Sequence, residues 1–162
     1  MWDKERGWGL SIDQASMLAG VSLWFNGTLK AYRVLEGGTR KTPMSNRLKA
    51  QVEQLDAFLE THLKDDECVS FVLFEDVKAK QVQMICGAYL TSARINCKIS
   101  KDSLVHTRTW KSWAQRMGAG GPIKDIKGVA ALEATGWDFN KYPTDSDDIA
   151  DSILMYLAWR AR

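Results

Sequence analysis

The sequence has few of the features that mark secreted, membrane-spanning or zinc-binding proteins. Its three cysteines, Cys68, Cys86 and Cys97, are odd in number and widely spaced, which favours reduced, buried thiols over disulfides or a zinc site. No apolar run approaches the roughly 20 residues that span a bilayer. The first residues, MWDKERGWG, are charged and lack the apolar core of a signal peptide. These absences together predict a cytoplasmic protein.

Two common enzyme signatures are also missing. His62 and His106 lack a serine or cysteine arrangement typical of a nucleophilic triad. The chain has no GxxxxGKS or GxxxxGKT loop for phosphate, and the glycine-rich GAGGP at residues 118–122 is a weak signal alone. Internal repeats and domain linkers are absent too, so we expect a single domain over residues 1–162.

Charge is nearly balanced overall but is unevenly distributed. The formal net charge is only +2, which does not by itself indicate a nucleic-acid partner. Between Arg94 and Gly128, however, eight basic residues stand against two acidic ones, a local excess of six positive charges. Such a segment is the electrostatic footprint expected of a protein that binds a phosphate backbone. A solvated surface is the alternative interpretation.

The order of predicted elements indicates an α/β fold with a mixed sheet of five strands. Residues 8–13, 17–25 and 28–36 are predicted antiparallel strands, and Asn26-Gly27 is typical of a hairpin turn. The apolar run CVSFVLFED predicts a central strand covered on both faces. The other predicted elements are a helix at 42–63 capped by Thr42 with Pro43 in its first turn, a helix at 78–91, a strand at 95–99, and helices at 109–117, 123–135 and 144–162. This order places helices on both faces of the sheet.

Four acidic residues fall at related places in these elements. Asp13 ends the first strand and Glu75 ends the buried strand, while Asp148 and Asp151 share a face near the start of the last helix. If the first and fourth strands are neighbours, Asp13 and Glu75 end side by side and the last helix can approach them. A carboxylate cage is what hard Mg²⁺ or Mn²⁺ selects. The alternative is that the acids accept turn hydrogen bonds, solvate a strand end and complement the helix dipole.

Four blocks of sequence together resemble the RuvC-type Holliday junction resolvases. They are GLSIDQAS followed by Ala19-Gly20, FVLFEDV, VHTRTWKSWAQRMGAGGPIKDIK and DSDDIADSI, which cover nearly the whole chain in the family's order. The smaller phage-encoded members are the most similar. The resemblance implies an RNase H-like fold, a homodimer, and Mg²⁺- or Mn²⁺-dependent cutting of four-way DNA junctions with two ions per active site. It also implies the cytoplasm of a host cell as the location.

The resemblance implies roles for individual residues as well. Asp13, Glu75, Asp148 and Asp151 match the family's metal ligands, and Asp147 is an alternative register for Asp148. Lys124 or Lys127 matches the catalytic basic residue near the scissile phosphate. The residues expected to contact DNA are Lys78, Lys80, Arg108, Lys111, Arg116, Lys124 and Lys127.

Two positions depart from the family pattern. Gln14-Ala15 stands where the family usually has Pro-Gly, so the turn after Asp13 must differ. Lys78 stands where the bacterial enzymes carry an aromatic residue that wedges into the junction centre. The alternatives are therefore a nuclease of the same fold that acts on flaps, forks or RNA–DNA hybrids, and a non-catalytic protein that binds branched DNA.

Two further expectations concern helices. The helix at 78–91 has Val82, Ile85 and Tyr89 along one side, and we expect this side to form the dimer interface. Trp110 and Trp113, three residues apart in the basic segment, are expected in the hydrophobic core rather than stacked on bases.

Overall fold

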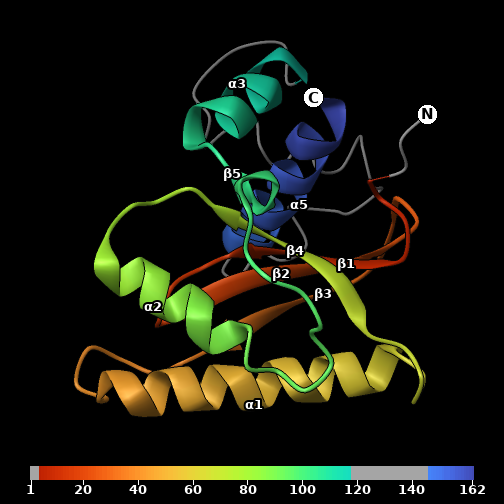
Figure 1. Cartoon of the computed structure of the whole chain (residues 1–162). Coiled ribbons are helices and arrows are strands. Elements are labelled where there is room, and N and C mark those ends of the chain that lie inside the picture. Colours follow the sequence, from red (N-terminus) through yellow and green to blue (C-terminus); the bar gives the residue numbers. More distant parts are fainter. Residues whose placement is uncertain (1–3, 118–145) are drawn as a thin grey trace.

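Three antiparallel strands form one half of a five-stranded sheet (Figure 1). The computed structural model describes residues 4–117 and 146–162, apart from the side chains at 117, 146 and 147. β1 (Trp8–Asp13), β2 (Leu18–Phe25) and β3 (Thr28–Glu36) pair in sequence order. Asn26 and Gly27 between β2 and β3 have φ values of 48° and 82°, as a tight hairpin turn requires.

The other half of the sheet is parallel. β4 (Val69–Glu75) lies between β1 and β5 (Leu104–Val105), which gives the order β3-β2-β1-β4-β5 and confirms the predicted mixed sheet. The strand expected at 95–99 is wrong, because Ile95 makes only one isolated bridge to Val69. The chain leaves the sheet there, and Cys97 packs against the core instead of extending the ladder.

Helices cover both faces of the sheet, as predicted (Figure 1). α1 (Met44–His62) and α2 (Lys80–Tyr89) lie on one face, and α5 (Ser146–Ala161) crosses the other. α3 (Thr107–Met117) packs on α5, and the short helix η1 (Lys101–Ser103) precedes β5. Two hydrophobic cores result, one on each face. The helix predicted at 123–135 lies outside the described residues.

The start of α1 differs from the prediction. Pro43 rather than Thr42 is the N-cap residue, and no side-chain hydrogen bond caps the helix. The Thr42 hydroxyl instead accepts a 3.4 Å hydrogen bond from the backbone N–H of Thr39. Pro43 itself contributes through its carbonyl oxygen, which accepts from Asn46 and Arg47 at 3.0 Å each.

The cysteines are free, as predicted, but only one of them is buried. Cys86 is buried, Cys97 is half-buried and Cys68 is exposed just before β4, so the expectation of three buried thiols is wrong for Cys68. Burial raises the pKa of the Cys86 thiol to about 12. Among the residues that the structure describes, no helix is long and apolar enough to cross a membrane.

The side of α2 that was expected to face a partner is internal. Ile85 and Tyr89 are buried, and Val82 packs against the same core beneath the sheet. The prediction that these three residues form a dimer interface is therefore wrong, because the chain's own β-sheet covers them. The outward side of α2 exposes 54% of Met84.

Candidate active site

Asp13 and Glu75 stand at the ends of two adjacent strands, on the same face of the sheet. β1 and β4 are parallel neighbours with Ile12 opposite Phe74, so the two acids follow side by side. Ile12 and Phe74 belong to the core beneath α1 and α2. Because side chains alternate along a strand, Asp13 and Glu75 lie on the opposite face, which α5 covers. The prediction that the first and fourth strands are neighbours is confirmed.

A glycine on β2 allows α5 to reach this place. Gly20 pairs with Asp13 across the antiparallel ladder. A Cβ atom at Gly20 would lie 2.0 Å from the carbonyl oxygen of Asp148 and 2.7 Å from the nitrogen of Ile149. A larger residue cannot occupy this position without moving α5. The backbone of Asp148 therefore lies directly against the residue opposite Asp13.

Asp151 is exceptional within α5. Every other residue from Ile149 to Trp159 is buried, because the helix packs between the sheet and α3, whereas Asp151 is half-buried. A carboxylate in a helix so enclosed is costly unless it has a partner or a function. Its position one turn after Asp148 places both acids on one side of the helix, as predicted.

The backbone brings these four positions to one region, and their chemistry suits a hard cation. All four side chains are half-buried carboxylates, the donor type that Mg²⁺ and Mn²⁺ prefer. In the part of the chain that the structure describes, no three His, Cys, Asp or Glu side chains are gathered into a metal-binding group. The four carboxylates fit such an ion by the chemistry of their oxygen donors, while the side chains are not drawn together into one cluster. The side chain of Asp147 lies outside the described residues.

Two donors from α3 hold the carboxylate of Glu75. The Thr107 hydroxyl donates to Oε1 at 2.8 Å, and the Trp110 indole N–H donates to Oε2 at 3.0 Å. Trp110 is only 2% exposed, which confirms its expected place in the core. Its hydrogen bond to Glu75 was not expected. The available signal was a threonine and a tryptophan three apart, which share one side of a helix.

The backbone of Glu75 is held from the other side by Gln14. The Gln14 side-chain amide donates from Nε2 to the Glu75 carbonyl oxygen at 2.7 Å, and its Oε1 accepts from the Glu75 N–H at 3.1 Å. The amide group thus continues the β1–β4 ladder by one more pair of hydrogen bonds. Gln14, the residue that directly follows Asp13, therefore ties the start of this turn to the end of β4.

Side chains from α1 and α2 fix the loop that follows Asp13. The carbonyl oxygen of Ala15 accepts from Gln51 Nε2 at 2.7 Å and lies 2.8 Å from the Tyr89 hydroxyl, while Arg47 donates to the Ser16 hydroxyl at 2.7 Å. Burial raises the pKa of Tyr89, and the nearby charge of Asp13 acts in the same direction. The loop beside the candidate site is therefore held in place by α1 and α2, the helices on the other face of the sheet.

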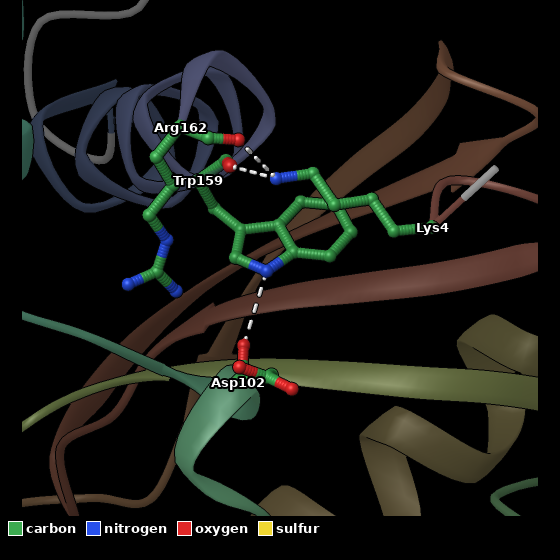
Figure 2. A pocket seen from close by; sticks show the side chains of 4 residues that line it. All are labelled: Lys4, Asp102, Trp159 and Arg162. Atoms are coloured by element: carbon green, nitrogen blue, oxygen red, sulfur yellow. Dashed lines mark hydrogen bonds between the residues drawn. The ribbon is translucent and has the colours of Figure 1, made fainter. Parts of the chain in front are cut away.

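One cavity of the described structure touches the candidate site, and another lies apart from it. The first, about 250 Å³, is lined by Glu75, Asp76, Val77, Gln83, Cys86, Ile99 and Leu104. The second, about 450 Å³, lies at the end of α5 (Figure 2). There Lys4 Nζ donates to the carbonyl oxygens of Trp159 at 2.6 Å and Arg162 at 2.9 Å, while the Trp159 indole donates to Asp102 O at 3.0 Å. Lys4 thus satisfies carbonyl groups left open at a helix C-terminus, which is a structural role.

The residues expected to contact DNA are exposed wherever the structure describes them. Arg108, Lys111 and Arg116 share the outer side of α3, opposite Trp110 and Ala114. Lys78 and Lys80 are exposed at the start of α2. Lys124 and Lys127 lie outside the described residues, so their expected roles stay predictions.

Comparison with known proteins points to one fold. No family model matches the sequence, and no curated protein sequence matches it significantly. A structure of Thermus thermophilus RuvC with a Holliday junction substrate is similar with a TM-score of 0.60 and 15% identity, over 97% of this chain and 96% of that one. A further structure of the same RuvC has a TM-score of 0.60 and 13% identity, over 94% of each chain. The fowlpox virus Holliday junction resolvase has a TM-score of 0.50 and 13% identity, over 95% of this chain and 97% of that one. The chain therefore has the RNase H-like fold of the RuvC-type Holliday junction resolvases.

Proposed function

We propose that the protein is a divalent-metal-dependent endonuclease that cuts Holliday junctions and related branched DNA. One observation carries this proposal. Within a RuvC-type fold, Asp13 and Glu75 end adjacent strands on one face, and Gly20 lets the acidic start of α5 approach them. Three separate elements thus bring carboxylates to the same end of the sheet, where β1 and β4 end. A purely structural role for each acid does not explain this.

The proposed metal ligands are Asp13, Glu75, Asp148 and Asp151, holding two Mg²⁺ or Mn²⁺ ions. Ions bound at such carboxylates supply an activated water and stabilise the leaving oxygen of a phosphodiester. The chain's own residues orient this site. Gln14, Thr107 and Trp110 hold Glu75, and the loop after Asp13 is anchored by Gln51 and Tyr89.

Exposed cations are proposed to bind the phosphate backbone. Arg108, Lys111 and Arg116 lie on the outer side of the helix whose inner side holds Glu75. Lys78, Lys80, Lys124 and Lys127 belong to the same proposed surface, with Lys124 nearest to the scissile phosphate by resemblance. Contacts of this type position DNA without reading its sequence, in keeping with recognition of a branched shape.

A homodimer is part of the proposal, because a four-way junction must be cut on two opposed strands. Two-fold symmetry supplies two equivalent sites. The outward side of α2 offers one exposed large apolar residue, Met84, to such a contact. A single-domain organisation and a phage origin likewise remain parts of the proposal.

The test is cleavage of a four-way junction beside a linear duplex, a flap, a fork and an RNA–DNA hybrid, with Mg²⁺ and with EDTA. We expect paired symmetric nicks in the junction that EDTA abolishes. Substitutions of residues that support metal ligands typically cost about 10- to 100-fold in activity. Asp13→Asn removes a proposed ligand, so its loss of cleavage should be larger, while junction binding in EDTA should be retained. Equal cutting of every branched form would favour the broader nuclease. Tight binding without cutting would favour a non-catalytic binding protein.

A further inference from the structure

The carboxylate of Glu75 is oriented from outside the candidate metal site. Both of its oxygens accept hydrogen bonds from α3, one from the Thr107 hydroxyl at 2.8 Å and one from the Trp110 indole at 3.0 Å. A carboxylate offers about four lone-pair sites on its two oxygens. Two donors, one on each oxygen, therefore fix the plane of the group and leave its remaining lone pairs available to a cation.

The two donors are themselves well held. Trp110 is buried in the core formed with α5, and its indole has one N–H at a fixed place on a rigid ring. Thr107 is half-buried at the first position of α3, immediately after His106 and the short strand β5. β5 pairs Val105 with Glu75, so the start of α3 is tied to the same strand end that it contacts.

α3 therefore has two sides with different chemistry. Its inner side touches Glu75 through Thr107 and Trp110, and its outer side carries Arg108, Lys111 and Arg116 without an acidic residue. A rigid helix that bears both sets places the proposed phosphate contacts at a fixed distance from the Glu75 carboxylate.

We propose that Thr107 and Trp110 are positioning residues, which hold the Glu75 carboxylate in the orientation that serves the metal site. This inference rests on the proposed function, because it gives Glu75 the role of a metal ligand. Neither residue touches the DNA or the reacting atoms in this proposal. Each acts through Glu75, as groups that hydrogen-bond a ligating carboxylate do in other metal sites.

The experiment uses two variants and two matched controls in the full-length protein. Thr107→Val removes the hydroxyl and keeps the side-chain shape, and Trp110→Phe removes the indole N–H and keeps an aromatic ring. Thr109→Val and Trp113→Phe make the same chemical changes on the same helix, at an exposed and a half-buried position respectively. Thermal unfolding of all four shows whether each protein is folded at the assay temperature.

Two measurements do not depend on cleavage. The Trp110 indole N–H resonance in NMR spectra, assigned by its loss in Trp110→Phe, should shift in Glu75→Gln and again on titration with Mg²⁺. Mn²⁺ affinity, measured by calorimetry without DNA, should fall about 10- to 100-fold in Thr107→Val and Trp110→Phe and stay unchanged in the controls. In junction cleavage, the same two variants should lose kcat with little change in KM.

The outcomes separate this inference from the proposed function. Weakened Mn²⁺ binding in both variants of a protein that cuts no branched DNA would uphold the positioning roles and reject the nuclease. A wild-type protein that cuts junctions, with Mn²⁺ affinity and kcat unchanged in Thr107→Val and Trp110→Phe, would overturn the positioning roles alone. No Mn²⁺ binding by the wild-type protein would overturn both.

Discussion

The face of the sheet beneath α1 and α2 and the face beneath α5 are built from different kinds of side chain. The first is packed mainly with aliphatic residues, such as Leu10 and Ile12 against Leu59. The second is rich in aromatic residues, and Trp24 stacks on Tyr156 with ring centroids 3.7 Å apart. All four candidate ligands lie at the edge of the second face. The first face is thus a scaffold, and the second supports the site.

The two faces are nevertheless connected at the loop after Asp13. Gln51 and Tyr89 belong to the scaffold helices, yet they hold the carbonyl oxygen of Ala15 beside the candidate site. Changes in the scaffold core should therefore act mainly on stability, whereas changes at the strand ends should act on both stability and activity. The predictions below test this division.

The largest loss of stability is expected in the scaffold core. Leu59→Ala removes a fully buried side chain and should lower the free energy of unfolding by about 2–5 kcal/mol. Urea denaturation gives this value. At a temperature where the variant is folded, its junction cleavage per folded molecule should equal that of the wild type, and a loss of kcat there would break the division between the faces.

A matched pair of glycines tests the site face next. Gly20→Ala places a methyl group against the backbone of Asp148, which should cost about 1–3 kcal/mol and displace the start of α5. Cleavage should fall with it. Gly87→Ala on α2 meets nothing within 4 Å and should stabilise the helix by up to about 1 kcal/mol with cleavage unchanged. Equal cleavage by the two variants would show that the close approach of α5 to β2 is not needed for activity.

Two glutamines make the same contact at different places. Gln14 bonds the backbone N–H and carbonyl of Glu75, and Gln54 bonds those of Glu36 at 2.8 and 2.7 Å. Replacing either by Leu removes two hydrogen bonds worth about 0.5–1.5 kcal/mol each. Only Gln14→Leu should lower kcat, because only Glu75 belongs to the site. Comparable cleavage by both variants would show that Gln14 contributes to stability and not to catalysis.

The last prediction concerns the stability of the scaffold face at alkaline pH. Burial raises the pKa of Cys86 from 9.0 to about 12 and also raises that of Tyr89. Above pH 9 the unfolded state therefore loses protons before the folded state, so stability is complete below that pH and declines as pH rises. Unfolding measured by circular dichroism should show a shallower decline in Cys86→Ala and Tyr89→Phe. A decline unchanged in both would assign it to other groups.

Much of the fold could be predicted because local patterns agreed with it. The Asn26-Gly27 turn, the third strand at 28–36 and the central strand before Glu75 follow from turn chemistry and from hydrophobic periodicity. The fifth strand could not be placed this way. Its two residues, Leu104 and Val105, are too few to show an alternation of apolar and polar side chains. The segment that begins at Ile95 was predicted as a strand, but it makes only one isolated bridge.

The candidate site was predictable in its acids but not in their surroundings. Asp13 and Glu75 are visible as polar residues that end apolar strands. The bond from Trp110 to Glu75 joins residues 35 positions apart, and that from Gln14 joins residues 61 apart. No local pattern indicates which of several polar side chains will complete such contacts. The prediction of a dimer interface on one side of α2 was wrong for a related reason. An apolar stripe on a helix does not reveal whether the same chain or a partner covers it.

The sequence by itself determined the alternation, turns and helix periods that produce a mixed sheet with helices on both faces, because these depend on residues close together in the chain. It also determined that carboxylates end β1 and β4 and begin α5. Only the tertiary structure decided that these ends meet on one face. That outcome depends on the parallel pairing of β1 with β4 and on the absence of a side chain at Gly20, where α5 crosses β2 in direct backbone contact.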